Sequence, residues 1–265
     1  MTPSSAVSSA ASQPSNPCDG SGFVVQSQKL SRVNVNTGAL VTIITNMGFS
    51  TTALGYNVLD DYVYGTQYYQ NPDNEDDVAY VLARIDVQAP GTLTRIGPLS
   101  NFWNMGDVDS DGFYWVGQNN QQTGFEWAKI DLRPGSASYG QRLEAGLTAT
   151  QGLDPMDWMS LPSGGGDYLY TMTNDASLAR FSKITKSWEI TRSYESVPYS
   201  RWGALFAVDS ENAIFATDDD SGSIWKFPLD GSNASLVNGH LDFPAQNGAS
   251  CRAGKSVLSQ APQGT

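Results

Sequence analysis

The sequence repeats one short strand pattern five times, and this repeat limits the possible folds more than any other feature. The copies begin at residues 30, 82, 127, 178 and 224, so their successive spacings are 52, 45, 51 and 46 residues. A period of roughly 40 to 50 residues is typical of the four-stranded blades of a β-propeller. Every copy carries a basic residue at its third position, and these residues are Arg32, Arg84, Lys129, Arg180 and Lys226.

The segments around each copy repeat as well. An aromatic-rich segment precedes every copy, and its period-two alternation predicts a second strand. These segments are Phe23–Gln28, Tyr62–Gln67, Phe113–Gln118, Tyr168–Thr173 and Ala213–Asp218. Before four of them lies a segment with a small or acidic residue, at Gly55, Gly106, Asp157 and Gly203. These segments would line the central channel, where small residues relieve crowding.

The fifth inner segment, residues 247–251, lies near the C-terminus instead of ahead of the first blade. The chain would therefore begin at the second strand of the first blade and supply the missing innermost strand from its other end. The sequence thus predicts an all-β, five-bladed β-propeller with a circular closure between the two ends of the chain.

The two cysteines fall where this closure would join the chain ends. Cys18 precedes the strand that begins at Phe23, and Cys251 lies in the segment expected to pair beside it. A disulfide between them would close a loop spanning most of the chain and stabilise the ring by about 5 kcal/mol on the chain-entropy argument. The alternative is two free buried thiols.

The repeat predicts a single propeller domain over residues 18–256. Residues 1–17 are a Ser/Ala/Pro tail without packing residues, for which we expect disorder, as for the short tail 257–265. A disulfide implies an oxidising compartment, and the sequon Asn233-Ala-Ser fits N-glycosylation there. No apolar signal segment precedes the tail, so we expect a secreted protein whose signal peptide has been removed.

The charge balance argues against two classes of partner. The chain has 15 Lys and Arg against 27 Asp and Glu, which gives a formal net charge of −12. Nucleic-acid binders draw most of their affinity from phosphate contacts with a basic face. An anionic membrane surface is disfavoured for the same reason, and the sequence has no run of about 18 apolar residues. We expect neither nucleic acid nor a membrane as a partner.

Residue counts also argue against common metal and nucleophile chemistry. A zinc site built from His or paired Cys cannot be assembled from one histidine and two cysteines. A Ser-His-Asp triad would need His240, which lies in a segment typical of an outer strand or loop. The stretch Asp107-Val-Asp109-Ser-Asp111-Gly112 resembles a Ca²⁺ loop, but its twelfth position is Gln118 instead of Glu. A polar turn is therefore favoured over calcium, and we expect no metal or cofactor.

Propellers usually bind ligands at the channel mouth, formed by the loops that enter the inner strands. Aromatic and Met side chains recur there, and such surfaces form adaptable apolar pockets. The candidates for substrate binding are Tyr56, Trp103, Met105, Met156, Trp158 and Trp202. The alternative is that these rings pack between blades. The long connection from Gln67 to Ala79 is a candidate lid, and its Tyr68 is a further candidate for substrate binding.

Three polar residues in the same region are candidates for catalysis: Asp107, Asp157 and Arg201. A buried carboxyl group there would have a raised pKa, and an arginine could clamp a ketone or enolate oxygen. Structural roles in turns or between blades are the alternative. The acidic stretches 71–77 and 218–222 are typical of solvated loops.

The segments CDGSGFVVQSQ, LSRVNVNTGAL, GYNVLDDYVYGTQ and NGASC resemble a group of secreted fungal propeller-like proteins, over residues 18 to about 255. This group is similar to the hetero-Diels–Alderases of fungal tropolonic sesquiterpenoid biosynthesis, which join a tropolone-derived o-quinone methide to a humulene-type terpene. The resemblance implies a cofactor-independent pericyclase acting on small apolar molecules. Its motifs are architectural, so no catalytic residue is carried over.

The residues are compatible with that chemistry. A cycloaddition needs no nucleophile or metal, and positioning two partners contributes about 7 to 11 kcal/mol in favourable cases. Arg201 with Asp107 or Asp157 would polarise the quinone-methide oxygen. Two alternatives are a carbohydrate-binding lectin and a glycosidase that uses Asp107 and Asp157, which would require a carboxylate separation of about 5 to 9.5 Å.

Overall fold

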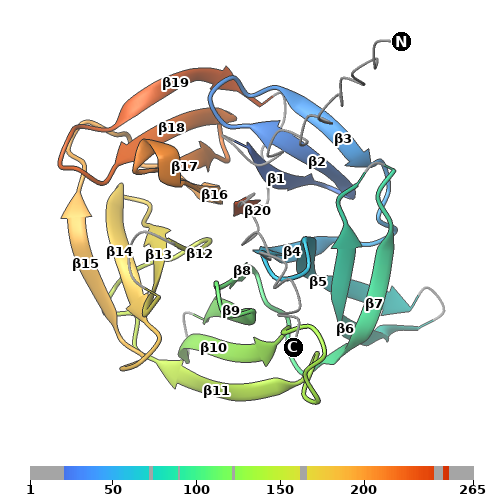
Figure 1. Cartoon of the computed structure of the whole chain (residues 1–265). Helices are drawn as coiled ribbons and strands as arrows, with labels where there is room; N and C mark the ends of the chain where they lie inside the picture. The colour runs from blue at the N-terminus through green and yellow to red at the C-terminus, as the bar shows by residue number, and fades with distance from the viewer. Residues whose placement is uncertain are drawn as a thin grey trace, which may run out of the picture.

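The computed structural model describes residues 21–71, 74–88, 90–120, 123–161, 166–241 and 247–250. Within them the chain forms five four-stranded sheets, arranged as blades around a central axis (Figure 1). All pairings between neighbouring strands of a blade are antiparallel. The prediction of an all-β, five-bladed propeller is confirmed.

Each blade extends from an innermost strand at the axis to an outermost strand at the rim. In that order, blade 1 contains β20 (Asn247–Ser250), β1 (Ser21–Gln26), β2 (Lys29–Asn34) and β3 (Leu40–Ile44). Blade 2 contains β4 (Thr51–Asn57), β5 (Tyr62–Asn71), β6 (Asn74–Asp86) and β7 (Leu93–Leu99). Blade 3 contains β8 (Met105–Val108), β9 (Phe113–Asn120), β10 (Gly124–Asp131) and β11 (Arg142–Thr148). Blade 4 contains β12 (Met159–Ser160), β13 (Tyr168–Met172), β14 (Ser177–Ser182) and β15 (Trp188–Ser193). Blade 5 contains β16 (Trp202–Val208), β17 (Ala213–Asp218), β18 (Ser223–Pro228) and β19 (Ser235–His240), with a 3₁₀ turn, η2 (Asp209–Glu211), after β16.

Strands from the two ends of the chain share blade 1. β20 pairs with β1, so that Gly22 lies opposite Ser250 and Val25 lies opposite Asn247. The predicted circular closure is therefore present at the level of the backbone. Cys18, Cys251 and the two tails lie outside the described residues, so the disulfide and the disorder of the tails stay predictions. No helix in the described part of the chain is long and apolar enough to cross a membrane.

The repeated basic residue lies opposite an aromatic residue in every blade. The pairs are Phe23–Arg32, Tyr64–Arg84, Trp115–Lys129, Tyr170–Arg180 and Phe215–Lys226. The cations also lie over aromatic rings: Lys129 Nζ is 3.7 Å from the centre of the Phe113 ring, and Arg180 Cζ is 3.9 Å from that of Tyr168. Such contacts contribute about 0.5 to 1 kcal/mol each at exposed sites. The third position of the repeat is therefore basic in every blade because the cation lies opposite an aromatic residue of the neighbouring strand. This position does not indicate a binding site.

Small residues near the axis permit the blades to converge. A Cβ atom on Gly106 of β8 would overlap the carbonyl oxygen of Ala53 in β4. One on Gly55 would lie 2.7 Å from the backbone nitrogen of Val108. Both contacts are with backbone atoms, which cannot move aside as a flexible side chain can. The small residues that the sequence places on the inner strands are thus required by the close approach of blades 2 and 3.

We expected a loop and a candidate lid over 67–79, but residues 67–71 continue β5 and residues 74–79 belong to β6. Gln67 pairs with Val81 and Tyr68 pairs with Tyr80. The acidic composition favours a loop, but Tyr68, Tyr69 and Val78 are residue types that are common in strands. The extended hairpin contacts its surroundings on both faces, because the Tyr80 ring lies 5.8 Å from that of Phe102 and the Tyr69 ring lies 4.8 Å from that of Phe49.

Candidate functional site

The aromatic residues predicted for the mouth lie mainly in the packing between blades. Trp158 is 1% exposed and packs with Phe125, Phe181 and Trp188 between blades 3 and 4, where Met105 is also buried. The same placement holds for the other rings: Tyr56 lies between blades 1 and 2, Trp103 between blades 2 and 3, and Trp202 between blades 4 and 5. The alternative stated for these residues, packing between blades, is what the structure shows. The side chains of Met156 and Tyr68 are half-buried.

Asp107 and Asp157 tie the inner strands of neighbouring blades together. Asp107 Oδ2 accepts hydrogen bonds from the backbone N–H (2.7 Å) and the hydroxyl (3.2 Å) of Ser160 in blade 4. Asp157 Oδ2 accepts one from the backbone N–H of Leu205 in blade 5 (3.3 Å). The free edge of an inner strand presents unpaired backbone groups, which these carboxyl groups satisfy.

Blade 1 uses polar side chains in the same way. Asn247 Oδ1 accepts from the backbone N–H of Ala53 in blade 2, and Ser250 Oγ accepts from that of Ala207 in blade 5, both at 2.7 Å. Around the axis, polar side chains therefore accept hydrogen bonds from backbone N–H groups of a neighbouring blade. Asp107 and Asp157 act structurally in this arrangement.

Burial raises the pKa of Asp157 well above its usual range, and the nearby Asp107 raises it further. The hydrogen bonds that Asp157 accepts from the backbone of Trp158 and Leu205 oppose this shift. Both carboxyl groups are buried, with side chains committed to the backbone, so neither is placed to contact a substrate. This placement argues against the glycosidase alternative built on these two residues.

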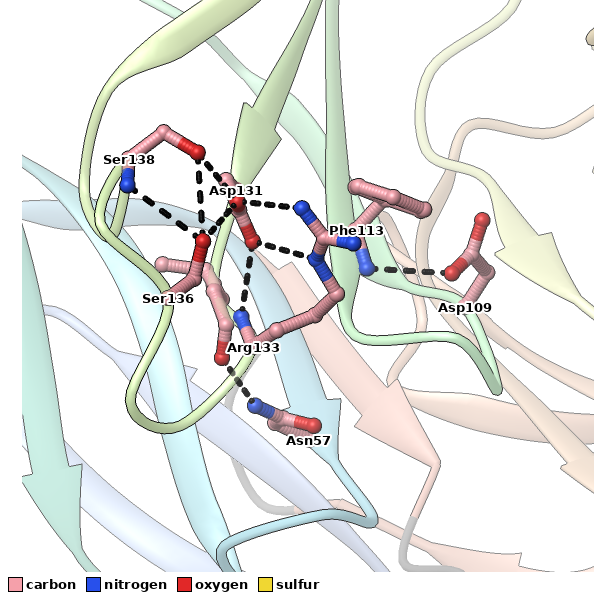
Figure 2. A network of polar contacts seen from close by, with 8 residues as sticks. Asn57, Asp109, Phe113, Asp131, Arg133, Ser136 and Ser138 are labelled. Carbon is pink, nitrogen blue, oxygen red and sulfur yellow. Dashed lines mark hydrogen bonds and ion pairs between the residues drawn. The ribbon is translucent and has the colours of Figure 1, made fainter.

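In the turn that resembles a calcium loop, a carboxylate forms an ion pair with a lysine side chain. Asp109 Oδ2 accepts from Lys183 Nζ (2.8 Å) and Trp115 Nε1 (2.9 Å). Asp109 Oδ1 accepts from the backbone N–H groups of Asp111 and Phe113, the second of which is drawn in Figure 2. No group of three or more acidic, His or Cys residues placed to hold a metal occurs among the described residues. The stretch is a polar turn held by an ion pair with blade 4.

A second polar network, centred on Asp131, was not predicted from the sequence (Figure 2). The Asp131 carboxylate accepts from Arg133 Nη2 (2.7 Å) and from the hydroxyls of Ser136 and Ser138 (2.6 Å each). The guanidinium group holds the pKa of Asp131 well below its usual range. Asn57 of blade 2 donates to the carbonyl of Leu132 (2.9 Å), so the network fastens the β10–β11 connection to the next blade. Its role is structural.

The open part of the mouth is polar and spans blades 3, 4 and 5. Asn119 and Asn174 donate to the two oxygens of Asp154, at 2.8 and 3.0 Å. The Asn174 amide also donates to the hydroxyl of Tyr199 (3.1 Å), whose side chain is 74% exposed. Tyr199 lies in the loop that enters β16, and Asp154 lies in the loop that enters β12. The four side chains therefore form a chain across the mouth that ends on an exposed ring.

Arg201 lies beside this chain, with its side chain 56% exposed, and forms an ion pair with Asp220 (Nη2 to Oδ1, 2.7 Å). Burial raises the pKa of Asp219 to about 7, although Arg201 opposes the shift. The stretch 218–222 was expected to be a solvated loop, but the side chain of Asp219 within it is half-buried. Among the predicted site residues, Arg201 reaches solvent at this face and Met156 does so in part, whereas Asp107, Asp157 and the tryptophans do not.

The sequence located the loop 199–202 at the mouth but not the orientation of its side chains. Tyr199 and Trp202 are both aromatic and stand three residues apart, yet Trp202 is buried against Phe227 (5.3 Å between rings) and Tyr199 faces solvent. His240 ends the outer strand β19 and is exposed, as expected for a surface residue.

Comparisons with known proteins agree with the fold. A chain in a crystal structure of a nidogen/laminin complex is similar, with a TM-score of 0.54 and 11% sequence identity over 89% of this chain and 99% of that one. A structural genomics protein of unknown function from Bacteroides thetaiotaomicron has a TM-score of 0.47 and 12% identity, over 78% of this chain and 55% of that one. The similarity to the first of these chains shows the fold alone, because the sequence identity is so low. None of the curated proteins compared gives a match.

A protein-family model built on repeats matches most of the chain. It is described as a repeat of unknown function (DUF6923), and it matches residues 21–238. This range begins with β1 and ends in β19, so it takes in the strands of all five blades except the closing β20. The chain belongs to the DUF6923 repeat family.

Proposed function

We propose that this protein binds a hydroxyl-rich ligand, a carbohydrate, at the mouth of the propeller. The observation that carries this proposal is the exposed ring of Tyr199, whose hydroxyl is fixed by the Asn174 amide. An aromatic ring offers an apolar face on which the C–H groups of a sugar ring can stack, while its hydroxyl remains available for hydrogen bonds.

The polar groups behind the ring suit the same class of ligand. The amides of Asn119 and Asn174 and the carboxylate of Asp154 supply donors and acceptors in a fixed arrangement, as sugar hydroxyls require. Asp219 and Asp220 lie at the same face, and the chain is acidic overall. These charges favour a neutral sugar over an acidic one.

Tyr199→Ala is expected to weaken binding of a neutral oligosaccharide about tenfold, the factor that corresponds to a loss of about 1.4 kcal/mol. Tyr199→Phe, which keeps the ring, should retain part of the affinity. A glycan array identifies the ligand, and titration calorimetry measures the affinity. Ile184→Ala removes an equally exposed apolar side chain from a different turn and should bind like the unchanged protein. Full binding by Tyr199→Ala, or no glycan bound by any form, would contradict the proposal.

The second candidate function is the hetero-Diels–Alder cycloaddition that the resemblance implies. The specific observation in its favour is that Arg201 is exposed and Met156 is half-buried in the loops that enter β16 and β12. Under this proposal Arg201 donates a hydrogen bond to the quinone-methide oxygen, and Met156 with Tyr199 contacts the hydrocarbon. The ligands would then be small apolar molecules, and no cofactor would be needed.

Arg201→Ala is expected to lower cycloadduct formation by about 10- to 100-fold, because a donor to the developing oxygen charge is removed. The test supplies a tropolone-type quinone-methide precursor and a humulene-type terpene, and measures the product by chiral chromatography and mass spectrometry. Asp220→Ala is the matched control, since it removes the ion-pair partner and keeps the guanidinium group. Equal yield and stereochemistry with and without Arg201 would reject this candidate.

We also infer passage through the secretory pathway. Asn233 of the sequon is exposed in the turn before β19, where an oligosaccharide could be attached without disturbing a blade. The turn is held by Arg192, whose guanidinium group donates to the carbonyls of Gly231 (2.6 Å) and Ser232 (2.7 Å).

A further inference from the structure

A groove of about 500 Å³ lies between blades 2 and 3. Its floor on the blade 3 side is the sheet face of β10 and β11. Because side chains alternate along a strand, Glu126, Ala128 and Ile130 of β10 share this face. Trp103 contributes from the loop that joins the two blades, and Ser100 and Asn101 form the opposite wall.

The groove lies where the exposed outer strand of blade 3 carries a small residue, Ala145, beside the buried Ala128. Ala128 of β10 is paired with Ala145 of β11. At the equivalent position of the repeat, the outer-strand partner is larger in every other blade: Thr42, Arg95, Ile190 and Leu236. The outer face of blade 3 therefore lacks the bulk that the other four blades have at this point.

Opposite charges mark the two ends of the groove. Arg142 pairs in register with Ile130, and Glu126 pairs with Leu147, so the two charged residues are separated by four positions along β10. At about 3.3 Å per residue, their backbones stand about 13 Å apart. Asn101 Nδ2 donates to Glu126 Oε2 (2.7 Å), which fixes the carboxylate at its end of the groove.

Arg142 remains available to a ligand. Its Nη1 donates to the hydroxyl of Ser100 (2.8 Å), and it forms no ion pair within the part of the chain that the structure describes. It also borders a smaller side pocket of about 200 Å³, lined by Pro98, Leu99 and Ile130. A cation therefore stands beside a small pocket that has apolar side chains in part of its wall.

We propose that this groove binds a short peptide of about three or four residues with free ends. The C-terminal carboxylate pairs with Arg142, and the apolar side chain of the last residue enters the side pocket. The N-terminal ammonium pairs with Glu126, and the small middle residues lie over Ala145. An extended peptide of this length spans about 10 to 14 Å, which matches the separation of the two charges. A bidentate contact with the guanidinium group favours a carboxylate over an amide at this end.

Titration calorimetry with the tetrapeptide Ala-Ala-Ala-Leu tests the proposal. The free acid should bind, and its C-terminal amide should bind about tenfold more weakly. Arg142→Gln should weaken binding of the free acid by a similar factor and leave binding of the amide unchanged. Glu126→Gln should weaken binding of the peptide with a free N-terminus and leave binding of the N-acetylated peptide unchanged. Lys29→Gln, in blade 1, is the matched control and should leave all affinities unchanged.

Ala145→Leu provides an independent variant, because it fills the groove at an exposed position without touching either charge. It should abolish peptide binding and keep the melting temperature of the unchanged protein. The proposal is overturned if the tetrapeptide does not bind at millimolar concentration, if the amide binds as tightly as the acid, or if Ala145→Leu binds normally. Binding of a fatty acid, but not of the peptide, through Arg142 would also overturn it.

Discussion

A chain that ends at residue 246 is expected to lose its cooperative unfolding transition. This truncation removes β20, the innermost strand of blade 1, in which all four residues are buried. It leaves the inner edge of β1 unpaired and removes the side chains of Asn247 and Ser250, which hold the backbones of blades 2 and 5. A blade cannot bury its faces alone, so the opened ring should expose apolar surface on both sides of blade 1. Thermal unfolding followed by circular dichroism measures the effect.

A chain that ends at residue 256 is the matched control, because it keeps β20 and lacks only the predicted tail. It should melt like the full chain. If the chain ending at residue 246 melts cooperatively at the same temperature, β20 does not close the ring.

Asp157→Ala is expected to lower the free energy of unfolding by about 3 kcal/mol, since each unsatisfied buried N–H costs about 1 to 3 kcal/mol. The side chain accepts hydrogen bonds from the backbone of its own blade at Trp158 and of blade 5 at Leu205. Urea unfolding measures the change. Asp167→Ala is the control, because Asp167 is exposed in the turn before β13 and should change stability by less than about 0.5 kcal/mol. Equal losses in the two variants would contradict the structural role of Asp157.

The raised pKa of Asp157 also predicts how stability depends on pH. The folded protein holds this proton more tightly than the unfolded chain, whose aspartates titrate near about pH 4. The contribution of the protonated carboxyl group is therefore complete below about pH 4 and is lost as the pH rises through the raised pKa. Asp157→Asn, which stays neutral, should remove this loss. Urea midpoints measured from acid to alkaline pH test it, and parallel curves for both proteins would show that Asp157 does not titrate in this range.

The number and order of the blades could be predicted because they depend on local patterns. Alternating aromatic residues define strands, and the strand pattern returns at intervals of 45 to 52 residues. The innermost strand of blade 1 could be assigned to residues 247–250 because every other blade had its own inner segment and this one was left over. The hairpin of β5 and β6 was missed, since its acidic tip concealed the strand pairing.

The site was harder to predict because an inner strand lies between two neighbouring blades. Period two tells which residues share a face, but both faces of such a strand are covered. Asp157 and Trp158 are adjacent in sequence and point in different directions, yet both are buried. Trp202 is buried, whereas Tyr199, three residues before it, is exposed because no neighbouring blade covers it.

The sequence by itself determined the repeat, the five blades and the strand that closes the ring, because each follows from local strand patterns and from the one blade that lacks its own inner segment. The tertiary structure alone decided which polar side chains hold the axis and which surfaces stay open. Leu205, which bonds to Asp157, stands 48 residues along the chain, in the next blade. The groove beside Ala145 likewise has its opposite wall in the connection between blades 2 and 3. Whether a side chain is exposed depends on which residues of the neighbouring blade lie against it. The local sequence pattern does not contain that information.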